Sequence, residues 1–408
     1  MFTDKLSLSL LREKLTQKLS ERPGARRSLL IRTALLALYL LMTVQFVGCY
    51  LFLSRPYIDL HKYAYGYERL PFQPRLLLAP LFRWSEHSLL MIRLASHWST
   101  NSYFFPHGIG PGGVLQFYID VPCVLIAGWV ALRLYQAASR RRLLGWLVYP
   151  LFLVLCVITY ILHAVQNYRF IYDMPSLMFF ALGLYLIYFR KPTILFVALF
   201  AVATLNRETT LLLIPFFLLS TCIQPENALS PTTVEASGQH SIHLSLIPAG
   251  SAPHRFEWKR VFQLEVAVPA ALMLAYWAAW HLFIFHLFRN NASEYYSRLN
   301  FNWYCFRRLR YYPQIFSAFG YLLPFVILFR KHLHDAQLRL WMWAIPAWVA
   351  LMAIWGILVE TRVYGELLPF VACAATLIAE EAITAAVRRR QVATDSNDDD
   401  RVHLVRAA

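Results

Sequence analysis

The segment Thr33–Ser54 reads TALLALYLLMTVQFVGCYLFLS and decides the class of fold. It contains no charged side chain, and a helix of about 20 apolar residues crosses the hydrocarbon core of a bilayer. Comparable apolar runs recur as far as Val387, and the 408-residue chain is 58% hydrophobic and only 15% charged. This composition excludes a disordered chain, a secreted disulfide scaffold and a cytosolic enzyme. It predicts an all-α, polytopic membrane protein.

The net charge of +16 does not indicate a nucleic-acid partner, because the basic residues lie in short clusters between apolar runs. This pattern is typical of the cytoplasmic ends of membrane spans. Of the 39 lysines and arginines, 25 fall on the side of these clusters and 14 on the other side. The clusters are at 26–32, 140–142, 190–191, 259–260, 330–331 and 388–390.

The apolar runs predict about ten spans with both termini in the cytoplasm. Residues 1–32 form an amphipathic cytoplasmic leader, 33–387 the transmembrane domain and 388–408 a cytoplasmic tail. The membrane domain contains a long outer loop at 55–111 and a polar cytoplasmic loop at 224–260. The expected spans are 33–54, 112–135, 143–163, 174–189, two short spans within 192–222, then 261–288, 313–329, 340–359 and 365–387.

Two stretches need a special placement. Residues 75–98 are amphipathic, so we expect helices that lie at the membrane interface instead of crossing it. The run from Pro192 to Cys222 is interrupted by Asn206-Arg207-Glu208-Thr209. One continuous helix would bury Arg207 and Glu208 at mid-membrane at a cost of several kcal/mol. We therefore predict a break there, with the tetrapeptide at an outer turn.

Four polar motifs fall at outer span ends, and each joins an arginine to a carboxylate and in most cases an aromatic residue. An arginine fork suits a phosphate, and a neighbouring carboxylate orients that fork or acts as a base. One such pair is more often an interfacial salt bridge, but four on one side predict a shared polar cavity. The candidates are Tyr57, Asp59, Glu68 and Arg75; Asn167, Arg169 and Asp173; Asn206, Arg207 and Glu208; and Glu360, Arg362 and Glu366.

We expect Asp59, Arg169, Arg207 and Arg362 to line this cavity, beneath the loop 55–111. Arg207 needs a carboxylate partner so close to the hydrocarbon, and Glu208 or Glu366 would supply it. Asp173 has a second interpretation, because a carboxylate at the start of a helix also complements the helix dipole. The six cysteines are scattered singly and no metal-ligand motif appears, so a divalent metal cofactor stays an open question.

The runs LPFQPRLLLAPL, NYRFIYDMP, NRETTLLLIP and ETRVYGELLP, with an acidic residue in a long first outer loop, give the chain a resemblance to a known class. It resembles the GT-C class of membrane glycosyltransferases, and also uncharacterised bacterial inner-membrane proteins loosely grouped with that class. The resemblance implies a bacterial inner-membrane enzyme that uses a polyprenyl-phosphate-linked sugar. It further implies that Asp59, or secondly Glu68, is the catalytic base.

The resemblance also implies that Arg169, Arg207 and Arg362 bind the phosphate of the lipid carrier. The leading hypothesis is therefore transfer of a sugar from polyprenyl phosphate to an outer acceptor, in the synthesis of an envelope glycoconjugate. A transporter or flippase of a lipid-linked or anionic solute is the first alternative, although few charges lie in mid-span and no repeat is evident. A non-catalytic protein of envelope assembly is the second, and it predicts polar motifs that do not meet.

Overall fold

The structure is a computed structural model that describes residues 23–101, 105, 108–162, 168–225, 254–294 and 296–407, and it is mostly helical. The first 22 residues of the predicted leader, residues 226–253 of the predicted polar loop and Asn167 lie outside the described residues. The α-helices are α2 (Pro23–Leu53), α3 (Leu60–Tyr65), α4 (Ala79–His87), α5 (Leu89–Asn101), α6 (Pro111–Ala138), α7 (Gly145–Tyr160), α8 (Asp173–Tyr188), α9 (Thr193–Thr204), α10 (Leu213–Thr221), α11 (Leu264–Leu287), α12 (Leu299–Phe306), α13 (Tyr312–Phe316), α14 (Leu322–Leu328), α15 (Ala336–Trp341), α16 (Ala344–Trp355) and α17 (Leu368–Ala407).

Short 3₁₀ helices and two small sheets connect these helices. The 3₁₀ helices are η1 (Leu76–Leu78), η2 (Glu208–Leu212), η4 (Trp258–Phe262), η5 (Leu309–Tyr311), η6 (Ala318–Tyr321), η7 (Arg330–His332) and η8 (Thr361–Leu367). Strand β1 (Arg55–Pro56) pairs in parallel with β2 (Tyr168–Arg169), and β3 (Ile223–Pro225) pairs antiparallel with β4 (His254–Phe256). The first sheet joins the long loop after α2 to the turn before α8.

Five helical segments of the described chain are long and apolar enough to cross a membrane. They are Leu29–Leu53, Pro111–Ala138, Leu264–Leu287, Ala336–Trp355 and Thr361–Gln391. A sixth arises if Leu309–Phe316 and Ala318–Leu328, which are bent by 86°, form one broken span. A membrane helix bundle is therefore supported, but the predicted ten spans are not confirmed. Four further apolar helices, Gly145–Tyr160, Asp173–Tyr188, Thr193–Thr204 and Glu208–Thr221, have only 10–17 residues.

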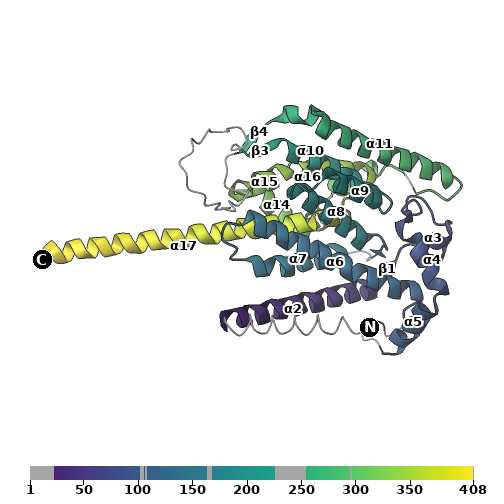
Figure 1. Cartoon of the computed structure of the whole chain (residues 1–408), viewed down its shortest axis with the longest axis horizontal. Helices are drawn as coiled ribbons and strands as arrows, with labels where there is room; N and C mark the ends of the chain where they lie inside the picture. The colour runs from purple at the N-terminus through teal and green to yellow at the C-terminus, as the bar shows by residue number, and fades with distance from the viewer. Residues whose placement is uncertain are drawn as a thin grey trace, which may run out of the picture.

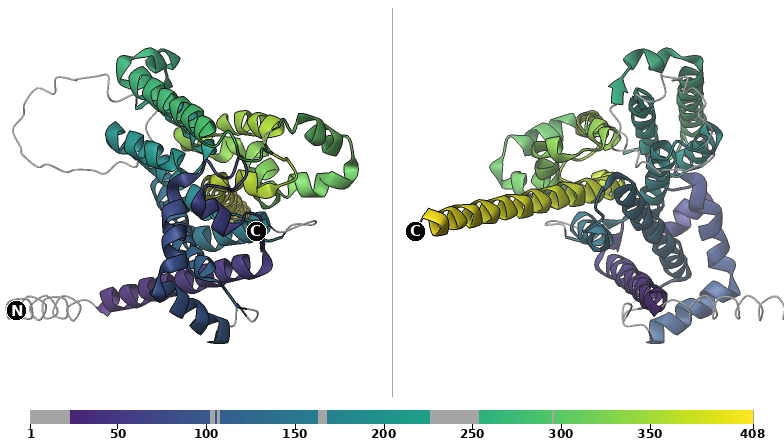
Figure 2. Two further views of the ribbon diagram at one scale, coloured as in Figure 1. Left: turned by 90° about the vertical axis from the view of Figure 1, so that its right-hand side faces the viewer. Right: turned by 60° about the vertical axis from the view of Figure 1, so that its left-hand side comes forward.

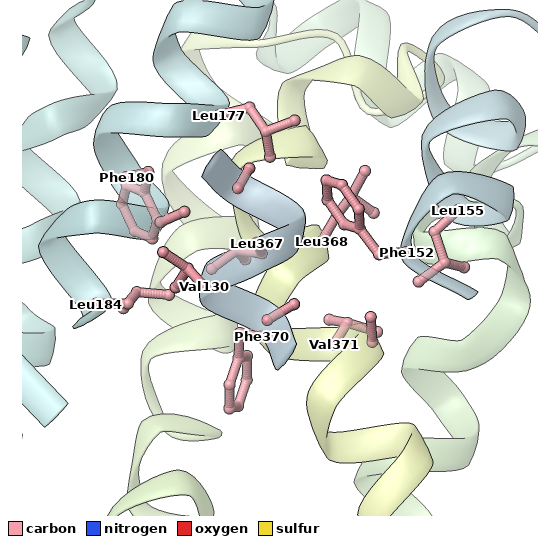
Figure 3. Packing of buried hydrophobic residues seen from close by; sticks show 14 of the residues in the cluster. Val130, Phe152, Leu155, Leu177, Phe180, Leu184, Leu367, Leu368, Phe370 and Val371 are labelled. Carbon is pink, nitrogen blue, oxygen red and sulfur yellow. The ribbon is translucent and has the colours of Figure 1, made fainter. Parts of the chain in front are cut away.

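Helix α6 forms the centre of the bundle and packs against α2, α7, α8 and α17. Figure 3 shows the interior, where Val130 of α6 lies among side chains of α7, α8 and the start of α17. Gly128 permits close packing of α6 on α7, since an added Cβ would lie 2.3 Å from a ring carbon of Tyr149. Small residues at such contacts matter in membrane proteins, where tight packing replaces much of the hydrophobic driving force.

The predicted break at Asn206 is present, because α9 ends at Thr204 and η2 begins at Glu208. The chain reverses direction there. Phe196 of α9 stacks on Phe217 of α10 with ring centroids 5.3 Å apart. Arg190, which precedes α9, donates to the carbonyl of Ile223, which follows α10, at 2.9 Å. Helices α9 and α10 thus form a hairpin with the polar tetrapeptide at its turn.

The two ends of the bundle differ. One end, called here the apical end, is crossed by α3, α4 and α5 (Figure 1). Helices α4 and α5 confirm the predicted amphipathic stretch, with Leu81, Trp84 and Leu89 exposed near Arg83 and Arg93. The opposite end is called here the basal end. It carries the short basic clusters that were predicted to be cytoplasmic, including 140–142 and 388–390.

Helix α17 departs from the predicted boundary at residue 388. It continues as one helix to Ala407 and extends far beyond the bundle (Figure 1). No glycine or proline follows Pro369 in this segment, and alanine, arginine and glutamine favour helix formation. The predicted tail is thus a direct extension of the last membrane helix.

Topology is tested with two single cysteines in a Cys49→Ser background. Tyr67 is 75% exposed near α3 at the apical end, and Arg389 is exposed at the basal part of α17. We expect Tyr67→Cys to react with a membrane-impermeant maleimide in intact cells and Arg389→Cys to react only after lysis. Labelling of both in intact cells would contradict a bundle with its two ends on opposite sides of a membrane.

Candidate functional site

A cavity of about 370 Å³ lies at the apical end and combines a charged wall with an apolar wall. Four arginines and three glutamates face it, from the loop after β1, from η2, from the segment after α11 and from the start of η8. These residues are Arg75, Arg207, Arg298, Arg362, Glu208, Glu294 and Glu360. Of the residues that the sequence analysis selected, Tyr57, Arg75, Arg207, Glu208, Glu360 and Arg362 line this cavity.

Arg75 and Glu208 form one charged pair of the wall. The Nε of Arg75 donates to Glu208 at 2.9 Å, and a second guanidinium nitrogen donates to its other carboxylate oxygen. The guanidinium also lies 4.0 Å from the ring centroid of Tyr172. Burial alone would lower the pKa of Arg75, but the charge of Glu208 outweighs burial and raises this pKa above its ordinary value. The pair fixes the long loop to η2 with Arg75 fully charged.

Arg207 is the second deeply buried cation of the wall, at 8% exposure against 7% for Arg75. Its Nη1 lies 3.2 Å from Oε1 of Glu366 and 3.6 Å from Oδ1 of Asp173. Both carboxylates are engaged by other donors: Glu366 accepts from the Thr209 hydroxyl at 2.6 Å and Asp173 from the Tyr50 hydroxyl at 3.1 Å. Among the described residues, Nε and Nη1 of Arg207 have no hydrogen-bond acceptor. The predicted pairing with Glu366 is confirmed, whereas Glu208 pairs with Arg75.

Arg362 and Glu360 form a second pair at the start of η8. The Oε2 of Glu360 accepts from Nε and Nη2 of Arg362 at 3.3 and 2.9 Å. The guanidinium stacks 3.6 Å from the ring centroid of Phe170, and its Nη1 lies 4.0 Å from Asp173. The described part of the chain provides no donor to Oε1 of Glu360, which is partly exposed on the cavity wall. This oxygen is the available proton acceptor of the wall.

Glu294 and Arg298 were missed by the sequence analysis. Glu294 accepts from the Tyr57 hydroxyl at 3.3 Å and pairs with Arg69 at 2.8 Å. The Arg298 guanidinium lies 3.8 Å from the ring centroid of Tyr296. Both residues follow α11 at a span end, so the combination of arginine, carboxylate and aromatic that identified the other motifs was present here too.

Asp59 does not line the cavity, so the predicted placement of this residue is wrong. Its carboxylate caps the N-terminus of α3 and accepts from the backbone N–H groups of His61 and Lys62 at 3.0 and 3.2 Å. Glu68 also lies outside the wall. It accepts from the N–H groups of Asp59 and Arg69 at 3.0 and 3.1 Å. An aspartate just before a short helix favours capping, and this local interaction fixes Asp59 away from the arginines.

Arg169 is likewise not part of the cavity wall. Its Nη1 donates to the carbonyls of Leu51 and Ser54, the latter at 2.7 Å, at the end of α2. Helix ends leave carbonyls without partners, and a cation there satisfies them. Asn206 also acts behind the wall, donating to Ser176 at 2.8 Å and to the Tyr172 carbonyl at 3.3 Å. Asn167 lies outside the described residues.

Arg169→Gln should therefore lower stability. Loss of a charged donor to two partly buried carbonyls costs on the order of 1–3 kcal/mol. We expect a lower melting temperature in detergent, measured by intrinsic fluorescence, with lipid binding retained by the folded fraction. Arg93→Gln, at an exposed position of α5, is the matched control. Equal melting temperatures for the two variants would contradict the capping role of Arg169.

The apolar wall of the cavity lies between α11 and α16. Trp277 comes from α11, and Leu351, Met352 and Trp355 come from α16. Helix α11 packs on α9 and α10, whereas α16 packs on α12 and α15. The indole of Trp277 donates to the Glu208 carbonyl at 3.0 Å and thereby joins the apolar wall to the charged one. The cavity can accept a molecule with one anionic and one hydrocarbon end.

No protein-family model, curated protein or solved structure matches the chain. Within the described part of the chain, no group of three or more histidine, cysteine, aspartate or glutamate side chains is placed to hold a metal ion. The chemistry of the cavity is therefore inferred from its own side chains.

Proposed function

We propose that the protein is a membrane glycosyltransferase that takes a sugar from a polyprenyl-phosphate donor and transfers it to an acceptor at the apical end. One observation carries the proposal: a wall of arginines meets an apolar wall between two helices in a single cavity. A phosphorylated lipid has this combination of parts. Its phosphate would meet the arginines while its chain lies along Trp277 and α16.

Arg207 is the central phosphate ligand in this proposal. Its guanidinium group lines an enclosed cavity and is largely buried, which favours an anion, because charge-assisted hydrogen bonds gain strength where water is scarce. Arg75 and Arg362 flank it, each held in orientation by a glutamate. During transfer the bond between the anomeric carbon and the phosphate oxygen breaks, and these arginines stabilise the charge that grows on the phosphate.

Glu360 takes the role of base in place of Asp59. Its Oε1 would accept the proton of an acceptor hydroxyl while that hydroxyl oxygen forms the new bond to the anomeric carbon. The electron pair of the broken bond leaves with the phosphate. Arg362, bound to the other oxygen of Glu360, would hold the carboxylate in position.

The alternative of a lipid or solute transporter is less well supported. A transporter needs polar groups along a path to the basal end. The core cluster of the bundle is built from apolar side chains, and within it Phe180 and Trp348 are buried in contact with each other at a centroid distance of 5.1 Å. The charged side chains that line the cavity all lie at the apical end, as a reaction on one side of the membrane requires.

Binding of the lipid chain is tested with Trp277→Ser. Loss of a buried aromatic contact removes about 1.5–3 kcal/mol, so the affinity for polyprenyl phosphate should fall by about 10-fold or more. Native mass spectrometry of the detergent-solubilised protein with added polyprenyl phosphate measures this affinity. Trp280→Ser is the matched control, because Trp280 lies on α11 but does not line the cavity. A loss of equal size in both variants would contradict the proposed position of the chain.

A further inference from the structure

A second cationic surface follows α11 and is not explained by the proposed reaction. Residues 296–312 contain four arginines and seven aromatic residues, and no acidic residue occurs between Glu294 and Asp335. Arginines on the apical side oppose the usual bias toward basic residues at the cytoplasmic ends of spans. A cluster of them there calls for an anionic partner. We call Arg298, Arg307, Arg308 and Arg310, with Tyr296, Trp303, Tyr304, Phe306, Leu309 and Tyr311, the arginine–aromatic face.

Three of the four arginines of this face, Arg298, Arg308 and Arg310, lie over aromatic rings. Arg308 lies 4.2 Å from the ring centroid of Tyr304, and Arg310 lies 4.9 Å from that of Tyr311. Arg310 also donates to both tyrosine hydroxyls, at 3.3 and 3.0 Å. Within the described residues, none of the four arginines has a carboxylate within ion-pair distance. Stacking orients the guanidinium groups and leaves their charge uncompensated.

Large apolar side chains lie beside these charges and are open to the surroundings. Trp303 is 60% exposed, Phe306 52% and Leu309 78%. Seen from the apical end, the segment with α12 and α13 projects sideways from the bundle (Figure 2, left). Exposed aromatic and aliphatic groups next to cations are typical of the level where lipid headgroups meet the hydrocarbon.

The face is rigidly joined to the cavity. Asn302 of α12 is 2% exposed and donates to the carbonyls of Ala353 and Gly356 at 2.8 Å each. Its side-chain oxygen accepts from the N–H of Leu358 at 2.9 Å. One amide thereby fixes α12 to the end of α16 and to the segment that leads to Glu360. Arg298 belongs to both surfaces.

We infer that the arginine–aromatic face binds the phosphate headgroups of anionic membrane lipids and seats α12 in the membrane interface. A soluble phosphate would use only the arginines, whereas Trp303, Phe306 and Leu309 give a lipid additional apolar contact. The inference is independent of the reaction proposed above, since it concerns the lipids around the cavity and not its substrate.

The test uses full-length protein with Leu309→Cys in a Cys49→Ser background, labelled with an environment-sensitive fluorophore. Mixed micelles contain rising fractions of brominated phosphatidylglycerol or brominated phosphatidylcholine, which quench the fluorophore on contact. We expect phosphatidylglycerol to quench at a lower fraction. Each basic residue near an anionic surface contributes about fivefold to affinity, so Arg307→Gln/Arg308→Gln/Arg310→Gln should weaken this response by about 100-fold.

Two variants serve as controls. Arg388→Gln/Arg389→Gln/Arg390→Gln removes the same charge at exposed basal positions and should leave quenching at Leu309→Cys unchanged. Arg307→Lys/Arg308→Lys/Arg310→Lys keeps the charge and should retain the preference for phosphatidylglycerol. Equal quenching by the two lipids in the parent protein would overturn the inference. Displacement of phosphatidylglycerol by sodium phosphate, compared with sodium chloride at equal ionic strength, would assign the face to a soluble phosphate instead.

Discussion

Arg207→Gln should abolish binding of polyprenyl phosphate and destabilise the folded protein by about 3–5 kcal/mol. The guanidinium is 8% exposed and lies close to Glu366 and Asp173. Without it, two buried carboxylates lose their shared cation, and the phosphate loses its central proposed ligand. Native mass spectrometry measures the bound polyprenyl phosphate, and the melting temperature in detergent measures the stability of the folded protein.

The two effects are separated by Arg207→Gln/Glu366→Gln. Neutralising Glu366 removes one of the two unpaired charges, so much of the lost stability should return. Lipid binding should stay absent because the phosphate ligand is still missing. Recovery of lipid binding together with stability would show that Arg207 serves only the fold, and the proposed phosphate site would then be wrong.

Glu360→Gln should reduce sugar transfer by on the order of 10²–10⁴-fold while the protein binds polyprenyl phosphate as before. The amide preserves the shape of the side chain but cannot take up a proton. Turnover is measured as loss of the lipid-linked sugar in membranes that contain equal amounts of each variant. The retained binding distinguishes loss of the base from collapse of the cavity.

Asp59→Asn is the comparison that decides between the two candidate bases. Asparagine also caps helices well, so this variant should fold and turn over substrate nearly as the parent does. Full turnover by Glu360→Gln together with loss in Asp59→Asn would return the base to the first outer loop. Full turnover by both variants would remove the transferase hypothesis and favour a non-catalytic role.

Local patterns in the sequence predicted the features that depend on local physics. The charge pair at Arg207 and Glu208 indicated the break between α9 and η2, since a continuous helix would have buried both. The amphipathic stretch predicted α4 and α5. The recurrence of arginine with carboxylate at span ends predicted that Arg169, Arg207 and Arg362 meet; Arg207 and Arg362 line one cavity, whereas Arg169 does not.

The partner with which each charged side chain pairs could not be predicted in the same way. It depends on how segments far apart in the sequence lie relative to each other in the fold. Arg75 binds Glu208, 133 positions away, although Glu68 is its nearer carboxylate in the sequence. Asp59 and Arg169 are of residue types that suit the predicted site. Both instead form hydrogen bonds with backbone groups at helix ends. The number of membrane spans could not be predicted from the sequence either. The length of an apolar run predicts a span, but the packing of the helices decides where each one ends.

The four short apolar helices have a consequence for the membrane itself. Helices α7 and α8 have 16 residues each, so each is about 24 Å long, against a hydrocarbon thickness of about 30 Å. Their polar apical ends, including Asp173, therefore lie below the level of the lipid headgroups unless the bilayer thins around them. A lipid-borne phosphate then meets these groups only where the bilayer thins or the phosphate enters the recess. Thicker bilayers should deepen this recess and slow access from water, which makes the activity sensitive to acyl-chain length.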